Sequence, residues 1–254
     1  MKTDYKTIRV EMREGVALLV MDNPPVNQLS EHFVRELAGA IAEAFRDGGV
    51  QAVVLTGVGR NFIAGADITQ IKDIRTRAQI LELLKDNNRF LNSIETGPKP
   101  VIAAINGHCL GGGLELAMAC HYRVAARGVE LGQAEVQIGL IPGAGGTQRL
   151  PRLIGLPNAL EMITTGKAVT SEKAFERTLV DELAEPAQLV ETAVKAARRF
   201  VSGQLNLKPR EWEILALIDG KRCVKEVNDA VGGDLFTTSK LIYGLVVMGV
   251  IELA

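Results

Sequence analysis

Residues 99–149 constrain the fold of this chain more than any other stretch of its sequence. The stretch begins with an apolar run at 100–105, which predicts a buried strand, and it continues into three consecutive glycines at 111–113. A largely apolar segment, 114–120, follows these glycines directly and predicts a helix that begins near Gly112. A strand joined to a helix through a glycine turn is typical of α/β proteins.

Two carboxylates lie within the same stretch, at positions where a charge is costly. Glu115 stands between Leu114 and Leu116, and Glu135 precedes a second glycine-rich segment at 141–146. An ionised carboxylate among apolar side chains needs either partners or a chemical use. One use is to hold a water molecule between two glutamates, one of which accepts a proton while the other donates one. The alternative is that each glutamate caps a turn or pairs with an arginine, such as Arg123 or Arg149.

The glycines suggest a second element of the same candidate site. The N–H of Gly112 belongs to the unpaired donors at a helix start, where the helix dipole adds partial positive charge. A second glycine-bearing loop, 64–67, offers another N–H group. Two such donors aimed at one carbonyl oxygen form an oxyanion hole. The alternative is that both segments are ordinary turns.

The rest of the first two hundred residues alternates between strands and helices. Glu14-Gly15 predicts the turn of an antiparallel hairpin, and Ser30 predicts the N-cap of a helix. The predicted strands are 7–12, 16–21, 53–56, 100–105, 122–125 and 129–131, and the predicted helices are 30–46, 67–73, 77–95, 112–120, 146–154, 158–165, 171–179 and 187–202. This alternation predicts an α/β fold with turns of chain stacked around one core.

The composition changes after residue 202. Residues 203–208 are typical of a linker, and 209–254 predict short helices followed by a terminal strand, which resembles a winged-helix module. Residues 203–254 together hold one more acidic than basic residue, and the predicted recognition helix of the tail, 237–248, carries only Lys240 as a basic side chain. Because DNA binding requires a basic face, we expect no DNA contact and interpret the tail as an interaction or oligomerisation module.

The bulk properties exclude several classes of protein. The formal net charge is -1 over 254 residues, so no global field attracts nucleic acid or a membrane surface. No apolar run is long enough to span a bilayer, and the first residues lack the apolar centre of a signal peptide. The cysteines are Cys109, Cys120 and Cys223, whose spacing fits no metal site. We therefore expect a cytoplasmic protein with reduced thiols and no bound metal.

Four segments of the chain, in this order, resemble the enoyl-CoA hydratase/isomerase (crotonase) superfamily. They are NPPVNQLS (23–30), NFIAGADI (61–68), KPVIAAINGHCLGGGLELAMAC (99–120) and LGQAEVQIGLIPGAGGTQRLPRLIG (131–155). The resemblance covers about residues 6–202 and implies a crotonase-like spiral of ββα turns as the catalytic domain, 1–202. It also implies substrates that are coenzyme A thioesters, and a homo-oligomer that is a trimer or a dimer of trimers.

The resemblance assigns roles to particular residues by their motif positions. It implies that the N–H groups of Ala66 and Gly112 hold the thioester oxygen, and that Glu115 and Glu135 are the catalytic pair. In such a site Glu135 protonates the α-carbon of the substrate, while Glu115 orients and activates the water that adds to the β-carbon. The donors then stabilise an enolate-like transition state, and no metal or redox cofactor is required.

Further residues match segments that line the coenzyme A groove in this family. Arg60 is the best candidate for a phosphate contact, since a guanidinium can form two hydrogen bonds to phosphate. The alternative is a solvated loop charge. The predicted contacts are Val26, Gln28, Arg60, Ala64, Asp67 and Ile68.

The presence of both glutamates favours an enoyl-CoA hydratase of fatty acid β-oxidation. Such an enzyme adds water reversibly, in the syn sense, to trans-2-enoyl-CoA and gives 3-hydroxyacyl-CoA. The alternatives are an enoyl-CoA isomerase, a hydratase of a cyclic or branched acyl-CoA, and an acyl-CoA-responsive regulator that acts through the tail. The chain departs from the family pattern at His121, where aspartate is common, and in the tail, where the family has helices that cover the acyl pocket.

Overall fold

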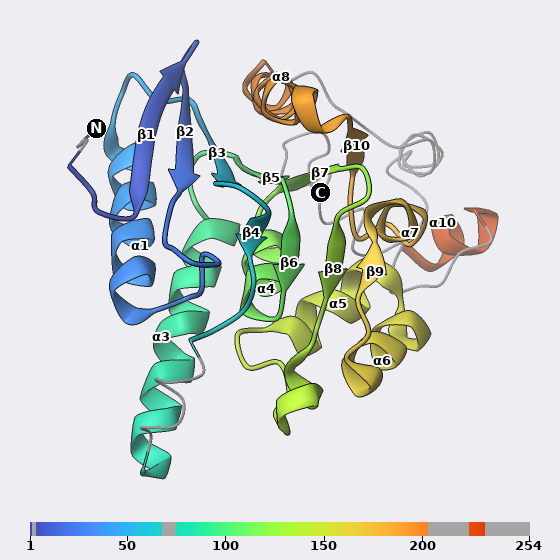
Figure 1. Cartoon of the computed structure of the whole chain (residues 1–254). Coiled ribbons are helices and arrows are strands. Elements are labelled where there is room, and N and C mark those ends of the chain that lie inside the picture. Colours follow the sequence, from blue (N-terminus) through green and yellow to red (C-terminus); the bar gives the residue numbers. More distant parts are fainter. Residues whose placement is uncertain (2–3, 68–74, 203–223, 232–254) are drawn as a thin grey trace. The chain divides into compact units, whose positions relative to one another are not determined.

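The computed structural model describes residues 1, 4–67, 75–202 and 224–231 (Figure 1). The chain divides into two compact units, Met1–Gly203 and Gln204–Ala254, which are described separately. None of the helices in the described part of the chain is both long and apolar enough to cross a membrane.

A six-stranded sheet forms the centre of the first unit. Its strands are β1 (Ile8–Arg13), β2 (Val16–Met21), β3 (Ala52–Gly57), β5 (Val101–Ile105), β7 (Tyr122–Ala126) and β10 (Glu182–Ala184), in that order across the sheet. The pair β1–β2 is the predicted antiparallel hairpin, and every other neighbouring pair is parallel. Parallel neighbours require crossover connections, and helices supply them.

A four-stranded sheet lies beside the first and is built by the same turns of chain. Its order is β4 (Asn61–Ile63), β6 (His108–Leu110), β8 (Glu130–Gly132) and β9 (Val169–Thr170). Three successive turns each place one strand in the large sheet and the next in the small sheet before a helix follows, as Figure 1 shows. The predicted fold, an α/β spiral of ββα turns, is therefore confirmed.

The helices of the first unit mostly begin where the sequence predicts. Ser30 caps α1, accepting a hydrogen bond from Phe33 N at 3.4 Å, and Thr76 with Gln79 forms a capping box at the start of α3. The helices are α1 (Glu31–Arg46), α3 (Arg77–Glu95), α4 (Gly112–Ala119), α5 (Gly146–Ile154), α6 (Leu156–Thr165), α7 (Ser171–Glu176) and α8 (Leu189–Val201), with 3₁₀ turns η1 (Glu135–Ile138) and η2 (Pro186–Gln188).

Strands β2, β3, β5 and β7 of the large sheet are buried on both faces, which explains their nearly continuous apolar sequences. On β2, Leu18 and Val20 face a cluster that includes Ala193 and Ala197 of α8. The alternate residues of the same strand, including Leu19, belong to the main core, which extends to α1, α4 and the small sheet. Leu114 and Ala117 anchor the first turns of α4 in this main core.

Two details of the sequence prediction were wrong. The predicted helix 171–179 ends at Glu176, and the chain then forms β10. Strands β4, β6, β9 and β10 were not predicted, because segments of two or three residues are too short to show an alternating pattern.

In the second unit the structure describes one helix, α10 (Val224–Val231). This helix coincides with one of the helices predicted for the tail. The other predicted helices and the terminal strand lie outside the described residues, so the winged-helix assignment stays a prediction.

Candidate active site

The glycine turn at the start of α4 lies at the centre of the candidate site. Gly111 has φ 53° and ψ -124°, a backbone conformation open only to glycine. Its N–H donates to Gly132 O at 2.8 Å, while its own carbonyl oxygen accepts the N–H groups of Leu114 and Glu115. The turn is therefore fixed by the adjacent strand β8, and the first N–H groups of α4 are directed outward.

Glu115 lies in the first turn of α4, and it is only 3% exposed. Its Oε1 accepts hydrogen bonds from Ala144 N at 2.8 Å and Gly146 N at 2.7 Å. Burial raises the pKa of Glu115, and these two N–H groups and the charge of Arg149 oppose that rise. Because Gly146 is the first residue of α5, Glu115 does cap a helix start, as one of the alternative interpretations of the sequence proposed.

Glu135 opens the 3₁₀ turn η1 after β8. Burial, together with the negative charge of Glu115, raises the pKa of Glu135 to about 7, against an ordinary value of 4.5. The amide group of Gln133, which is 1% exposed, lies 2.9 Å from Oε1 and 3.1 Å from Oε2 of Glu135, and we assign its nitrogen to this side because it can then donate to both oxygens. The sequence analysis missed Gln133, because a lone glutamine between a strand and a turn carries no pattern.

The two carboxylates meet at the glycine turn. A β-carbon placed on Gly111 would lie 3.3 Å from Oε1 of Glu135, and one placed on Gly112 would lie 4.0 Å from Oε2 of Glu115. The fold thus brings Glu115 of α4 and Glu135 of η1 to the same turn, although they are separated in the sequence. Their different surroundings separate their pKa values, which is the arrangement that a general base and a general acid require.

Ala66 lies beside the same turn. Leu29 pairs with Ala66 in a parallel bridge, in which Leu29 N donates to Gly65 O at 3.0 Å and Asp67 N donates to Leu29 O at 3.4 Å. In such a bridge the N–H of the central residue points away from its partner, so the N–H of the exposed Ala66 is directed outward. The Cα of Gly65 is 3.8 Å from the β-carbon position of Gly111, so the loop 64–67 adjoins the start of α4.

The predicted coenzyme A contacts lie on two adjacent segments. Ala64 N donates to Val26 O at 3.2 Å, and the buried Asn27 donates to the carbonyl groups of Asn61 and Phe62. A pocket of about 240 Å³ opens here, lined by Asp22, Pro24, Pro25, Val26, Asn27, Val58, Gly59, Arg60 and Asn61. Val26 and Arg60 thus share one pocket, whereas Gln28, Ala64 and Asp67 lie outside its lining and Ile68 is outside the described residues.

The arginines considered as partners for the glutamates have other partners. Arg123 forms a buried ion pair with Asp181 at 2.6 Å, and Arg149 pairs with Glu95 at 2.8 Å. His121 has a structural contact, accepting the N–H of Val101 at Nδ1, 3.1 Å away. Neither arginine therefore neutralises Glu115 or Glu135 by direct contact.

This geometry fits a class of protein, the enzymes that transfer protons next to a carbonyl group bound by backbone N–H donors. The family model described as Enoyl-CoA hydratase/isomerase matches residues 11–208. The chain belongs to this family, which confirms the prediction made from the four sequence segments.

Individual relatives extend the comparison. A probable enoyl-CoA hydratase of Bacillus subtilis is 41% identical over 194 residues, which are 76% of this chain and 75% of that protein. The fatty acid oxidation complex subunit alpha of Shewanella loihica is 38% identical over 242 residues, which are 90% of this chain but 34% of that larger protein. The crystal structure of enoyl-CoA hydratase from Bacillus anthracis is 30% identical, with a TM-score of 0.73 over 96% of this chain and 91% of that one.

Proposed function

We propose that this protein is an enoyl-CoA hydratase, which adds water reversibly and in the syn sense to trans-2-enoyl-CoA and forms 3-hydroxyacyl-CoA. The observation that carries the proposal is the pair of glutamates at the glycine turn, with Glu115 held by two backbone N–H groups and the pKa of Glu135 raised to about 7. The relatives named for this activity and for fatty acid oxidation support it.

The protonation states follow from the surroundings of each carboxyl group. The N–H groups of Ala144 and Gly146 stabilise an ionised Glu115, whereas Glu135 retains a proton up to a pH of about 7. An ionised Glu115 can accept a proton from water, and a protonated Glu135 can donate one to carbon. The singly protonated pair is therefore the active form.

In the proposed step the thioester oxygen accepts the N–H groups of Ala66 and Gly112. Glu115 takes a proton from water as the oxygen of that water bonds to the β-carbon. The electron pair of the double bond then takes the proton of Glu135 at the α-carbon. Transfer of the new proton from Glu115 to Glu135 restores the starting state, so one water is consumed for each substrate. This chemistry uses no redox or metal cofactor.

The pocket beside Val26 and Arg60 is the proposed site for the charged part of coenzyme A. Among the described residues, no carboxylate forms an ion pair with the exposed Arg60 guanidinium, which leaves its donors open for a phosphate. Asp22, in the same lining, forms a 4.0 Å ion pair with Arg9. Gln28, Ala64, Asp67 and Ile68 stay proposed contacts along the path from this pocket to Ala66. A homo-oligomeric assembly and a cytoplasmic location stay predictions from the sequence.

The test measures the loss of crotonyl-CoA absorbance with the wild type, Glu115→Gln and Glu135→Gln. We expect rapid hydration by the wild type and a fall of about 10²–10⁴-fold in kcat in each variant, because each loses one acid–base group. Glu130→Gln is the matched control, since Glu130 is an exposed residue of β8 that contacts His108.

Two outcomes would refute this assignment. Unchanged hydration in both variants would refute the site. A wild type that shifts the double bond of a 3-enoyl-CoA, and leaves crotonyl-CoA unchanged, would identify an isomerase instead.

A further inference from the structure

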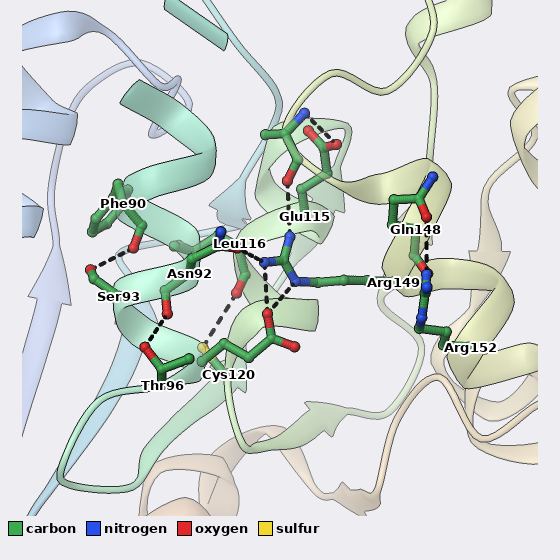
Figure 2. Close-up of polar contacts among 12 residues, drawn as sticks. Phe90, Asn92, Ser93, Thr96, Glu115, Leu116, Cys120, Gln148, Arg149 and Arg152 are labelled. Carbon is green, nitrogen blue, oxygen red and sulfur yellow. Dashed lines mark hydrogen bonds and ion pairs between the residues drawn. The ribbon is translucent and has the colours of Figure 1, made fainter. Parts of the chain in front are cut away.

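Arg149 of α5 lies beside the candidate site without touching either glutamate. Its side chain is only 10% exposed. Nη2 donates to Oδ1 of Asn92 and to Oε2 of Glu95, each at 2.8 Å, and Nε donates to the same Glu95 oxygen at 3.1 Å. Figure 2 shows the guanidinium of Arg149 directed from α5 toward α3, close to Asn92. The two helices are thus joined by one side chain.

The fourth contact of Arg149 leads to Glu115. Nη1 donates to Ala144 O at 3.1 Å, and the N–H of the same residue donates to Oε1 of Glu115 at 2.8 Å. Arg149 therefore holds one side of Ala144 while Glu115 holds the other. The two contacts lie on the peptide groups on either side of the Ala144 Cα, so the Arg149 contact restrains the backbone next to the N–H that Glu115 accepts.

A second side chain of α3 holds the same loop. Asn88 donates to Gly143 O at 3.0 Å. Asn88, Asn92 and Glu95 follow one another at intervals of four and three residues, so they lie on one face of α3. One helix face thus anchors residues 143–146 through Asn88 directly and through Arg149.

The sequence of the loop fits this arrangement. Gly145 has φ 96°, and a β-carbon on it would overlap with Nη1 of Arg149. Any other residue at this position would displace the guanidinium. The positive charge of Arg149 also lowers the pKa of Glu115, against the effect of burial.

We propose that Arg149 is a positioning residue for the reaction proposed above: anchored by Asn92 and Glu95, it fixes Ala144 so that two N–H donors occupy Oε1 of Glu115 and leave Oε2 for the water. This inference rests on the proposed function. It assigns part of the activity to α3, which contributes no group that reacts.

The experiment compares Arg149→Met with Arg152→Met in the crotonyl-CoA assay. Arg152 lies on the same helix, but its guanidinium contacts Gln148 rather than the loop, so Arg152→Met removes the same charge and leaves the loop contacts in place. We expect Arg149→Met to lower kcat by about 10- to 100-fold with less than about a threefold change in KM, as a misplaced catalytic group would. We expect Arg152→Met to match the wild type.

Two further readouts separate positioning from a general loss of structure. In Arg149→Met the acidic limb of the kcat/KM profile should move to higher pH, because Glu115 loses a nearby positive charge. In a Glu115→Gln background, Arg149→Met should lower kcat less than about threefold, since its effect passes through the missing carboxylate. If Arg149→Met does not fold, Asn92→Ala removes one anchor at an exposed residue and should give the same changes on a smaller scale.

Each outcome has a defined meaning. Two results would overturn the positioning role alone, provided that the wild type hydrates crotonyl-CoA. The first is that Arg149→Met lowers kcat equally in the wild-type and Glu115→Gln backgrounds, and the second is that it does not move the acidic limb of the kcat/KM profile. A wild type that does not hydrate crotonyl-CoA would overturn the proposed function, and the positioning role with it.

Discussion

Glu115 and Glu135 reach the same glycine turn from two regions that are built differently. The region of Glu115 is a helix start and a loop, in which backbone N–H groups from 144 and 146 converge on one carboxylate oxygen. The region of Glu135 is a single 3₁₀ turn, and its carboxyl group receives a side-chain amide instead. Val136 and Ile138 on that turn are 38% and 49% exposed.

This difference teaches how one site can give two carboxyl groups different pKa values. Backbone N–H donors stabilise the charge on the buried Glu115 and oppose the rise in pKa that burial causes. Within the described part of the chain, no backbone N–H of another element donates to the Glu135 carboxyl group, and burial and the charge of Glu115 raise its pKa to about 7. The predictions below test this contrast, from the largest expected effect to the smallest.

The strongest test is a comparison of stability. Glu115→Ala leaves the N–H groups of Ala144 and Gly146 without their acceptor, so we expect a loss of about 1–3 kcal/mol in the free energy of unfolding. Glu135→Gln should instead stabilise the protein at pH 8. The folded-state pKa of Glu135, about 7, exceeds its ordinary 4.5, so the ionised wild-type residue destabilises the fold increasingly as pH rises through this window.

Urea unfolding at pH 4 and pH 8 measures both effects. At pH 4 Glu135 is protonated in both states, and the benefit of Glu135→Gln should vanish. Equal destabilisation by Glu115→Ala and Glu135→Ala would show that the two regions hold their carboxyl groups in the same way.

The second test is the pH dependence of kcat/KM. Because the active form carries one proton on the pair, activity should fall about tenfold per pH unit well above pH 7, where Glu135 ionises. It should fall again at low pH, where Glu115 is protonated. Since hydration takes up and releases no net proton, its equilibrium constant does not depend on pH, and hydration and dehydration should share one profile. A rate that keeps rising above pH 9 would contradict the assignment of the acid to Glu135.

The smallest effect is expected at Gln133. The amide of Gln133 donates to the carboxylate of Glu135, so Gln133→Met should raise the pKa of Glu135 and move the basic limb of the profile to higher pH. The maximum rate should remain within about tenfold of the wild type, because both glutamates are retained. An unmoved basic limb, measured beside Glu130→Gln as a control, would show that the amide does not tune Glu135.

Much of the spiral could be predicted because each turn contains a long buried strand and an amphipathic helix. Three of the four short strands of the second sheet could not, since Asn61–Ile63 and His108–Leu110 are strands only because they pair with each other and with β8. Glu115 could be selected as a candidate because its neighbours in sequence are apolar. Its partners could not be predicted, since Ala144 and Gly146 donate through the backbone, which no residue type records.

The sequence by itself determined the fold class, the glycine turn at the start of α4 and the two glutamates beside it. These features depend on local periodicity, on the positions of glycines and on the order of motifs, all of which can be read from the sequence. The tertiary structure alone decided that Arg149 joins Asn92 and Glu95 to the loop holding Glu115, and that Gln133 contacts Glu135. The contacts of Arg149 with Asn92 and Glu95 join two helices that are far apart in sequence. Polar side chains, including those of the near neighbours Gln133 and Glu135, acquire a partner only when packing fixes which of many donors and acceptors lie within reach.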